Sequence, residues 1–81
     1  MTIETPELKI KRVREIKNIS QKFVADQLNI SLRAYYKIET GKTQITINRL
    51  NDISKILGVP AIEILQFDPE SYLKNSKLLD Q

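Results

Sequence analysis

The 81-residue sequence contains no cysteine and no histidine. Without cysteine the chain can form neither disulfides nor thiolate nucleophiles, and without histidine it lacks the commonest general base and metal ligand. The remaining carboxylates, lysines, tyrosines and serines form no nucleophile–base pair, no metal-binding cluster and no glycine-rich phosphate loop. The sequence therefore predicts a protein that is not an enzyme and that has no catalytic residue, metal site or cofactor.

Long apolar runs are also missing, and helix-breaking residues are few. No run approaches the roughly 20 residues that span a bilayer, and the opening residues MTIETPELK lack the basic and apolar regions of a signal peptide. We therefore expect a cytoplasmic protein with no membrane partner. With two glycines, three prolines and 41% hydrophobic residues, the chain is expected to form one all-α domain, to which a partner subunit would add stability.

Positive charge is modest overall but unevenly distributed. The net charge of +3 is compatible with a polyanionic partner. Between residues 31 and 49 the chain carries four basic residues, Arg33, Lys37, Lys42 and Arg49, against the single acid Glu39. This segment is the candidate for contact with a negatively charged partner.

Residues 20–41 show the pattern of two short helices joined by a tight turn. Ser20 and Ser31 are the expected N-caps, and Asn29 suits the left-handed end of the first helix. Each helix places apolar residues at i, i+1 and i+4, which gives one buried stripe. These residues are Val24, Ala25 and Leu28 in the first helix and Ala34, Tyr35 and Ile38 in the second. The pattern predicts a helix–turn–helix.

The opposite face of the second helix carries Leu32, Arg33, Tyr36 and Lys37. Arg and Lys can donate to guanine O6 and N7, and Leu can contact a thymine methyl. Tyr36 can contact a base or donate to a phosphate. These four residues are the candidate base-contacting set of a helix placed in the major groove. The alternative is an ordinary solvated helix face, against which the exposed Leu32 and Tyr36 argue.

The loop after this helix contains further donors. Lys42, Thr43 and Gln44 are placed to contact DNA phosphates through side chain or backbone. For Thr43 and Gln44 a plain linker is an equally good interpretation.

Three more helices are expected around this motif. The first begins at Thr5 and Pro6 and runs to about Lys17; the fourth spans residues 47–57; the fifth, short, opens at Pro60. The expected buried residues are Ile10, Val13 and Ile16 in the first, Ile47, Leu50, Ile53, Ile56 and Leu57 in the fourth, and Ile62, Ile64, Leu65 and Phe67 in the fifth. The last residues, 68–81, form a tail with Tyr72, Leu73, Leu78 and Leu79, either a final helix or a frayed end.

Residues 10–65 resemble the Xre/Cro-type helix–turn–helix family, the DNA-binding domain of phage repressors and many small bacterial regulators. No single residue is diagnostic, but the ordered set at this spacing is specific. The matching residues are Ile10, Val13, Arg14, Ile19, Ser20, Gln21, Val24, Ala25, Leu28, Ile30, Ser31, Ile38, Glu39, Gly41, Leu50, Ile53, Leu57, Gly58, Val59 and Ile64. The resemblance implies a compact five-helix, lambda-repressor-like domain over residues 1–67, with residues 68–81 as a dimerisation or docking tail.

The resemblance also implies roles for particular residues. Gln21 would clamp a phosphate at the start of the first motif helix. Arg14 and Glu39 would form a partly buried ion pair that ties the first helix to the third. The residues at 32, 33, 36 and 37 occupy base-contacting positions of the family, and residues 42–44 its backbone-contacting loop.

Two functional hypotheses follow from these features. The first is a sequence-specific regulator of transcription, acting as a repressor and binding double-stranded DNA as a homodimer on a palindromic operator. The second is a protein-interaction module, an antitoxin or adaptor of the same fold, that contacts a partner protein through the fifth helix and the tail.

Overall fold

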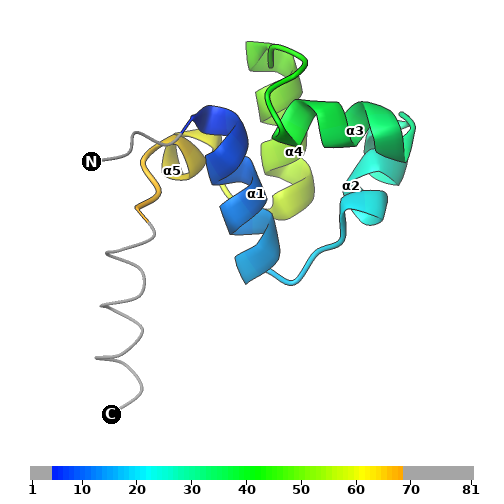
Figure 1. Ribbon diagram of the computed structural model, residues 1–81. Coiled ribbons are helices and arrows are strands. Elements are labelled where there is room, and N and C mark those ends of the chain that lie inside the picture. Colours follow the sequence, from blue (N-terminus) through cyan, green and yellow to red (C-terminus); the bar gives the residue numbers. More distant parts are fainter. Residues whose placement is uncertain (1–4, 69–81) are drawn as a thin grey trace.

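The computed structural model describes residues 5–68, so the expectations for the first four residues and for Tyr72, Leu73, Leu78 and Leu79 lie outside the described residues. Within residues 5–68 the chain forms five α-helices and no strand, which confirms the all-α prediction (Figure 1). The helices are α1 (Pro6–Ile16), α2 (Gln21–Leu28), α3 (Leu32–Glu39), α4 (Ile47–Leu57) and α5 (Ala61–Leu65). In the same range no helix combines the length and apolar character that crossing a bilayer requires.

Side-chain caps fix where four of the helices begin. The hydroxyl oxygens of Thr5, Ser20, Ser31 and Thr46 accept from the backbone N–H three residues further on, at 3.2, 3.0, 3.0 and 3.1 Å. Each such cap contributes about 1 kcal/mol to helix stability. The helix starts predicted from these hydroxyl residues are therefore confirmed.

Residues in the left-handed conformation lie at the C-terminal ends of three helices. Asn18 and Asn29 have φ angles of 58° and 59°, and Gly58 has 72°. Asn adopts this conformation more readily than other residues that carry a Cβ atom. At Asn29 the reversal lets Ile30 N–H donate to Ala25 O at 3.0 Å, which closes the end of α2 and starts the turn to α3.

One apolar core joins all five helices. Helix α2 packs on α3 and α4, α1 packs on α3 and α5, and α4 packs on α5. Figure 1 shows α5 beside α1, on the side of the molecule away from α2 and α3. The buried residues are Ile10, Val13, Val24, Ala25, Tyr35, Ile38, Leu50, Ile53, Leu57 and Ile64. The core therefore lies behind α3 and leaves the opposite side of that helix uncovered.

Three isoleucines and one leucine expected in the core are exposed instead. Ile16, Ile47 and Ile62 are 43%, 77% and 59% exposed, and Leu65 is 36% exposed. At about 100° per residue, Ile16 lies roughly 120° around α1 from Ile10, whereas Arg14 lies about 40° away and is buried in its place. Ile47 is the first residue of α4, a turn before the buried Leu50.

Candidate nucleic-acid interface

Helix α3 presents one buried face and one exposed face. Tyr35 is fully buried and Ile38 is 5% exposed, so these two side chains fix the helix against the core. The cap at Ser31, on the N–H of Ala34, sets the first turn. The orientation of the outer side of α3 is therefore determined by packing beneath it.

All four candidate base-contacting residues lie on the exposed face of α3. Arg33 and Lys37 are exposed, and Leu32 and Tyr36 are 49% and 50% exposed. They form two rows one helical turn long, 32 with 36 and 33 with 37. The two apolar members, Leu32 and Tyr36, lie half in solvent, where apolar surface is open to a partner.

The loop after α3 is attached to the end of that helix. Gly41, at a φ of 78°, turns the chain, and Thr43 N–H donates to Lys37 O at 3.1 Å. Lys42, Thr43 and Gln44 are all exposed. The three candidate phosphate donors of the loop therefore lie next to the C-terminal end of α3.

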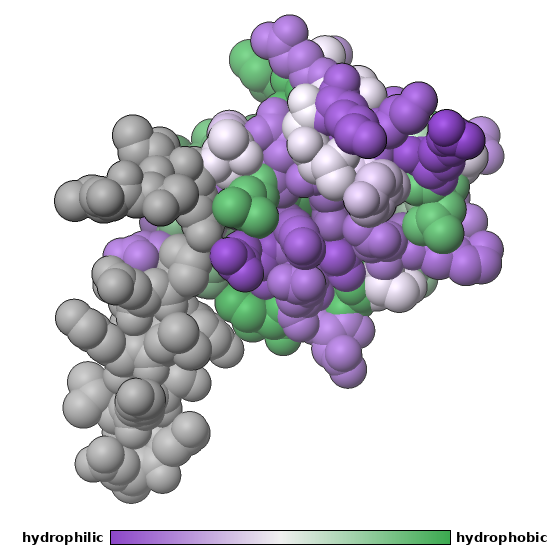
Figure 2. Space-filling model, viewed as in Figure 1, coloured by the Kyte–Doolittle hydropathy of each residue, from purple (hydrophilic) through white to green (hydrophobic). Residues whose placement is uncertain are grey.

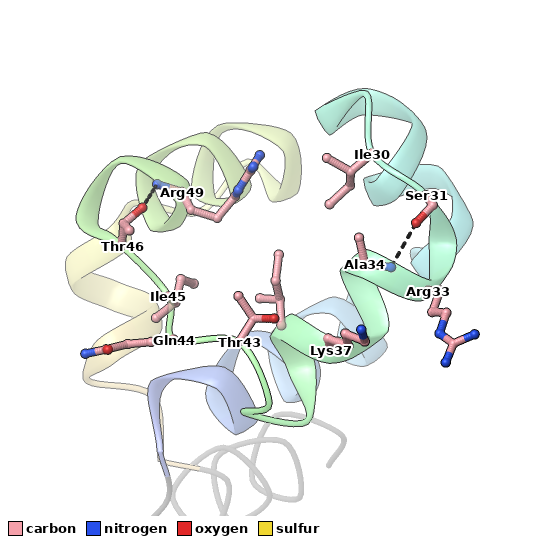
Figure 3. Close-up of a pocket in the computed structure, with 11 residues that line it drawn as sticks. Ile30, Ser31, Arg33, Ala34, Lys37, Thr43, Gln44, Ile45, Thr46 and Arg49 are labelled. Atoms are coloured by element: carbon pink, nitrogen blue, oxygen red, sulfur yellow. Dashed lines mark hydrogen bonds between the residues drawn. The ribbon is translucent and has the colours of Figure 1, made fainter.

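A groove of about 510 Å³ separates α3 from this loop and from the start of α4 (Figure 3). We call it the loop-side groove; its polar and charged lining includes Arg33, Lys37, Thr43, Gln44, Thr46 and Arg49. Figure 3 shows Lys37 on α3 and Arg49 on α4 on opposite walls, with the Arg33 guanidinium directed out to solvent. Within residues 5–68 these three cations make no ion pair, so the groove favours anions.

A second groove, of about 420 Å³, lies on the other side of α3. We call it the α1-side groove; Thr5, Leu8, Lys11, Gln21, Tyr36 and Thr40 line it, together with an edge of Glu39. It brings residues of α1, the start of α2 and Tyr36 of α3 together. Two grooves, each lined by both polar and apolar residues, thus flank the exposed face of α3.

The structure joins Arg14 and Glu39 in a buried ion pair between α1 and α3. Arg14 Nε donates to Glu39 Oε2 at 2.6 Å and Nη2 donates to Oε1 at 3.1 Å. The Arg14 and Glu39 side chains are 9% and 1% exposed. The remaining guanidinium nitrogen, Nη1, donates to Ile19 O at 2.8 Å, so this arginine also fixes the α1–α2 connection.

Two more donors complete the surroundings of Glu39. Tyr35 Oη donates to Oε2 at 2.5 Å, and Gln21 Nε2 donates to Oε1 at 3.0 Å. Burial alone raises the pKa of Glu39, but the hydrogen bonds from Arg14, Tyr35 and Gln21 outweigh it and leave that pKa below its ordinary value. Burial and then the bond to Glu39 raise the pKa of Tyr35. Glu39 is therefore held as a carboxylate and Tyr35 as a neutral phenol.

The sequence did not place Lys11 or Arg49 beside α3, and it did not identify Tyr35 as a hydrogen-bond donor. The i to i+4 spacing of Tyr35 and Glu39 was a usable signal, because such residues face the same way on a helix. Arg49 was counted in the basic segment 31–49 without a place beside α3, and Lys11 had no such signal. They join the grooves only because α1 and α4 pack beside α3.

Figure 2 shows a largely hydrophilic surface interrupted by small hydrophobic areas.

Comparison with known proteins gives two matches and one negative result. A helix-turn-helix family model matches residues 10–64. The chain is also 34% identical over 76 residues to an uncharacterized, SPbeta prophage-derived HTH-type transcriptional regulator, YonR, of Bacillus subtilis (strain 168); the match covers 88% of this chain and 70% of that protein. No solved structure matches the chain.

Proposed function

The chain belongs to the Xre/Cro-type helix–turn–helix family, and from this premise we propose that it regulates transcription by binding double-stranded DNA sequence-specifically. The exposed face of α3 is the observation that carries the proposal. Arg33, Tyr36 and Lys37 are directed outward while Tyr35 and Ile38 are buried beneath them. A helix so fixed can enter the major groove as a rigid unit.

Each exposed side chain of α3 has a role in this proposal. Arg33 and Lys37 donate to guanine O6 and N7, and Leu32 packs on a thymine methyl. Tyr36 contacts a base or a phosphate at the edge of the groove. These contacts specify the sequence, because base edges in the major groove present a distinct pattern for each base pair.

Phosphate contacts hold the helix in register. Lys42, Thr43 and Gln44 donate to the backbone beside the loop-side groove. At the start of α2, free N–H groups and the positive end of the helix dipole favour a second phosphate next to Gln21. Such contacts carry little sequence information but supply much of the affinity.

The proposed regulator is a cytoplasmic repressor that acts as a homodimer on a palindromic operator. A small domain with one recognition helix covers few base pairs, and a twofold dimer doubles the site. An operator with two symmetric half-sites follows from this arrangement.

A protein-interaction module is the second candidate function. It is favoured by Ile62 and Leu65, which are 59% and 36% exposed on α5. Salt dependence separates the two candidates. Binding of DNA through phosphates weakens steeply as salt rises, with a slope of about −0.9 per phosphate contact on a log–log plot.

The test begins with selection of bound duplexes from a random pool. Binding of the selected duplex is then measured between about 50 and 200 mM salt. Over this range we expect the affinity to fall by a factor of several tens or more. Arg33→Ala should lose about 1 to 3 kcal/mol and accept any base at one position. Lys55→Ala, an exposed change on α4 away from both grooves, is the control and should leave the base preference intact. Equal affinity of wild type and Arg33→Ala for every duplex would reject this role of Arg33.

A further inference from the structure

The Gln21 side chain is only partly available for a phosphate. Its Nε2 donates to Glu39 Oε1 at 3.0 Å. Because a carboxylate offers only acceptors, the nitrogen and not the oxygen of the amide must face Glu39. One side-chain N–H is thereby committed inward, and Gln21 in any case carries no positive charge. A positive side chain for an anion in the α1-side groove must therefore come from another residue.

Lys11 is the cation that lines this groove. Two other basic residues of α1 are committed elsewhere: Arg14 donates to Glu39, and Lys9 Nζ donates to Leu65 O at 2.5 Å. The ammonium group of Lys11 has no hydrogen-bond or ion-pair partner within residues 5–68. Glu39, whose edge lines the same groove, is neutralised by Arg14 and is 5% exposed.

The position of Lys11 complements the charge on the other side of α3. A helix with its side chains is about 10–12 Å wide, close to the roughly 12 Å width of the major groove. A helix lying in that groove therefore has a sugar–phosphate backbone on each side. Arg49 and the loop are on the side of one backbone, and the α1-side groove is on the side of the other.

We propose that Lys11 binds a backbone phosphate of DNA in the α1-side groove, so that α3 is held to both strands that border the major groove. Tyr36 lines the same groove, and its hydroxyl can donate a hydrogen bond to such a phosphate. Gln21 then acts chiefly on the inner side, where its amide holds Glu39. This inference rests on the proposed function and adds a residue outside the helix–turn–helix to the contact surface.

The experiment measures binding of the full chain to a random-sequence 24-base-pair duplex as a function of salt. A random duplex is suitable because a phosphate contact does not depend on base sequence. Lys11→Gln should make the log–log salt slope less negative by about one and weaken binding roughly tenfold near 50 mM salt. Lys55→Gln, which removes the same charge from an exposed position of α4 outside both grooves, should retain the wild-type slope.

A second variant separates charge from packing. Lys11→Arg retains the positive charge and should retain the wild-type slope. If Lys11→Gln has the wild-type slope, or if Lys11→Arg loses as much as Lys11→Gln, the phosphate role of Lys11 is wrong while DNA binding stands. If the wild-type chain shows no salt-dependent binding at all, the proposed function itself fails.

Discussion

At the scale of single residues, Glu39 connects the core of the domain to its candidate DNA-contacting surface. Its two oxygens accept from Arg14, Tyr35 and Gln21. Three helices, α1, α2 and α3, are thereby joined through one carboxylate. A buried charge pair of this kind is strongly destabilising when one partner is removed, because the other charge is left without compensation.

Tyr35→Phe isolates the hydroxyl from the packing of the ring. The variant keeps a buried aromatic side chain but removes the donor to Glu39 Oε2. A hydrogen bond to a charged group contributes about 1.5 to 3 kcal/mol, and we expect the free energy of unfolding in urea to fall by about that amount.

Tyr36→Phe is the matched control for this prediction. Tyr36 is 50% exposed, and its hydroxyl makes no hydrogen bond within residues 5–68. The same chemical change there should alter the unfolding free energy by less than about 0.5 kcal/mol. Equal effects of the two variants would show that the Tyr35–Glu39 bond contributes nothing of its own.

The lowered pKa of Glu39 also predicts a pH dependence of stability. Burial acts to raise this pKa, but the hydrogen bonds from Arg14, Tyr35 and Gln21 lower it by more than burial raises it. In the unfolded chain the pKa of a glutamate is about 4.3. Between the folded and unfolded values the unfolded state binds more protons, so stability falls as the pH falls. The contribution of Glu39 is present above about pH 4.3 and is lost as the pH drops through its folded-state pKa.

Two measurements check this sign. The free energy of unfolding should decrease as the pH falls below about 4.3, and a carboxyl-carbon NMR titration should give Glu39 a midpoint below the ordinary value of about 4.3. A midpoint above that value would mean that burial outweighs the three donors.

At the scale of elements, the turn between α2 and α3 sets how α3 leaves the body of the domain. Asn29 adopts a φ of 59°, and Ile30, partly buried, packs against the core behind the turn. The Ser31 cap then begins α3 at once. The left-handed conformation of Asn29, the packing of Ile30 and the cap at Ser31 therefore fix this turn together.

Asn29→Ala should destabilise the domain more than Asn29→Gly. Alanine has a Cβ atom and no side-chain polar group to favour the left-handed region, whereas glycine enters that region without steric penalty. We expect a difference of about 1 kcal/mol between the two variants in urea unfolding. Asn51→Ala, the same change at an exposed site inside α4, should be neutral or slightly stabilising. Equal stability of Asn29→Ala and Asn29→Gly would contradict this interpretation of the turn.

At the scale of the whole molecule, charge surrounds the exposed face of α3. Arg33 and Lys37 lie on α3, Arg49 lies on α4 and Lys11 on α1, so three helices contribute cations around one surface. Glu39, the acid of α3, is buried and paired with Arg14. The surface is therefore positive although the net charge of the chain is only +3.

A homodimer that presents two copies of this surface makes a prediction about the operator. Duplexes selected from a random pool should contain inverted repeats, with half-site centres about 10 to 10.5 base pairs or a multiple of this apart. Footprinting should show protection of both half-sites, and light scattering should give two chains per duplex. A selected site with one unrepeated half, bound by one chain, would contradict the homodimer.

Much of the fold could be predicted because it depends on local chemistry. The hydroxyl residues Thr5, Ser20, Ser31 and Thr46 cap helices through the backbone N–H three residues further along the chain, which is a local contact. Helix α4 has the predicted bounds. The expected exposure of Leu32 and Tyr36 rests on their angular separation from Tyr35 and Ile38, which the helix repeat fixes. The roles of these residues on DNA stay predictions.

The sequence by itself determined the five helices, the side-chain caps of four of them and the division of α3 into two faces, because these depend on residues within one or two turns of each other. Only the tertiary structure decided that Ile16, Ile47 and Ile62 stay in solvent, that Tyr35 and Gln21 share Glu39 with Arg14, and that Lys11 and Arg49 lie beside α3. These features depend on where separate helices meet, and helical periodicity gives the direction of a side chain on its own helix but not what lies opposite it.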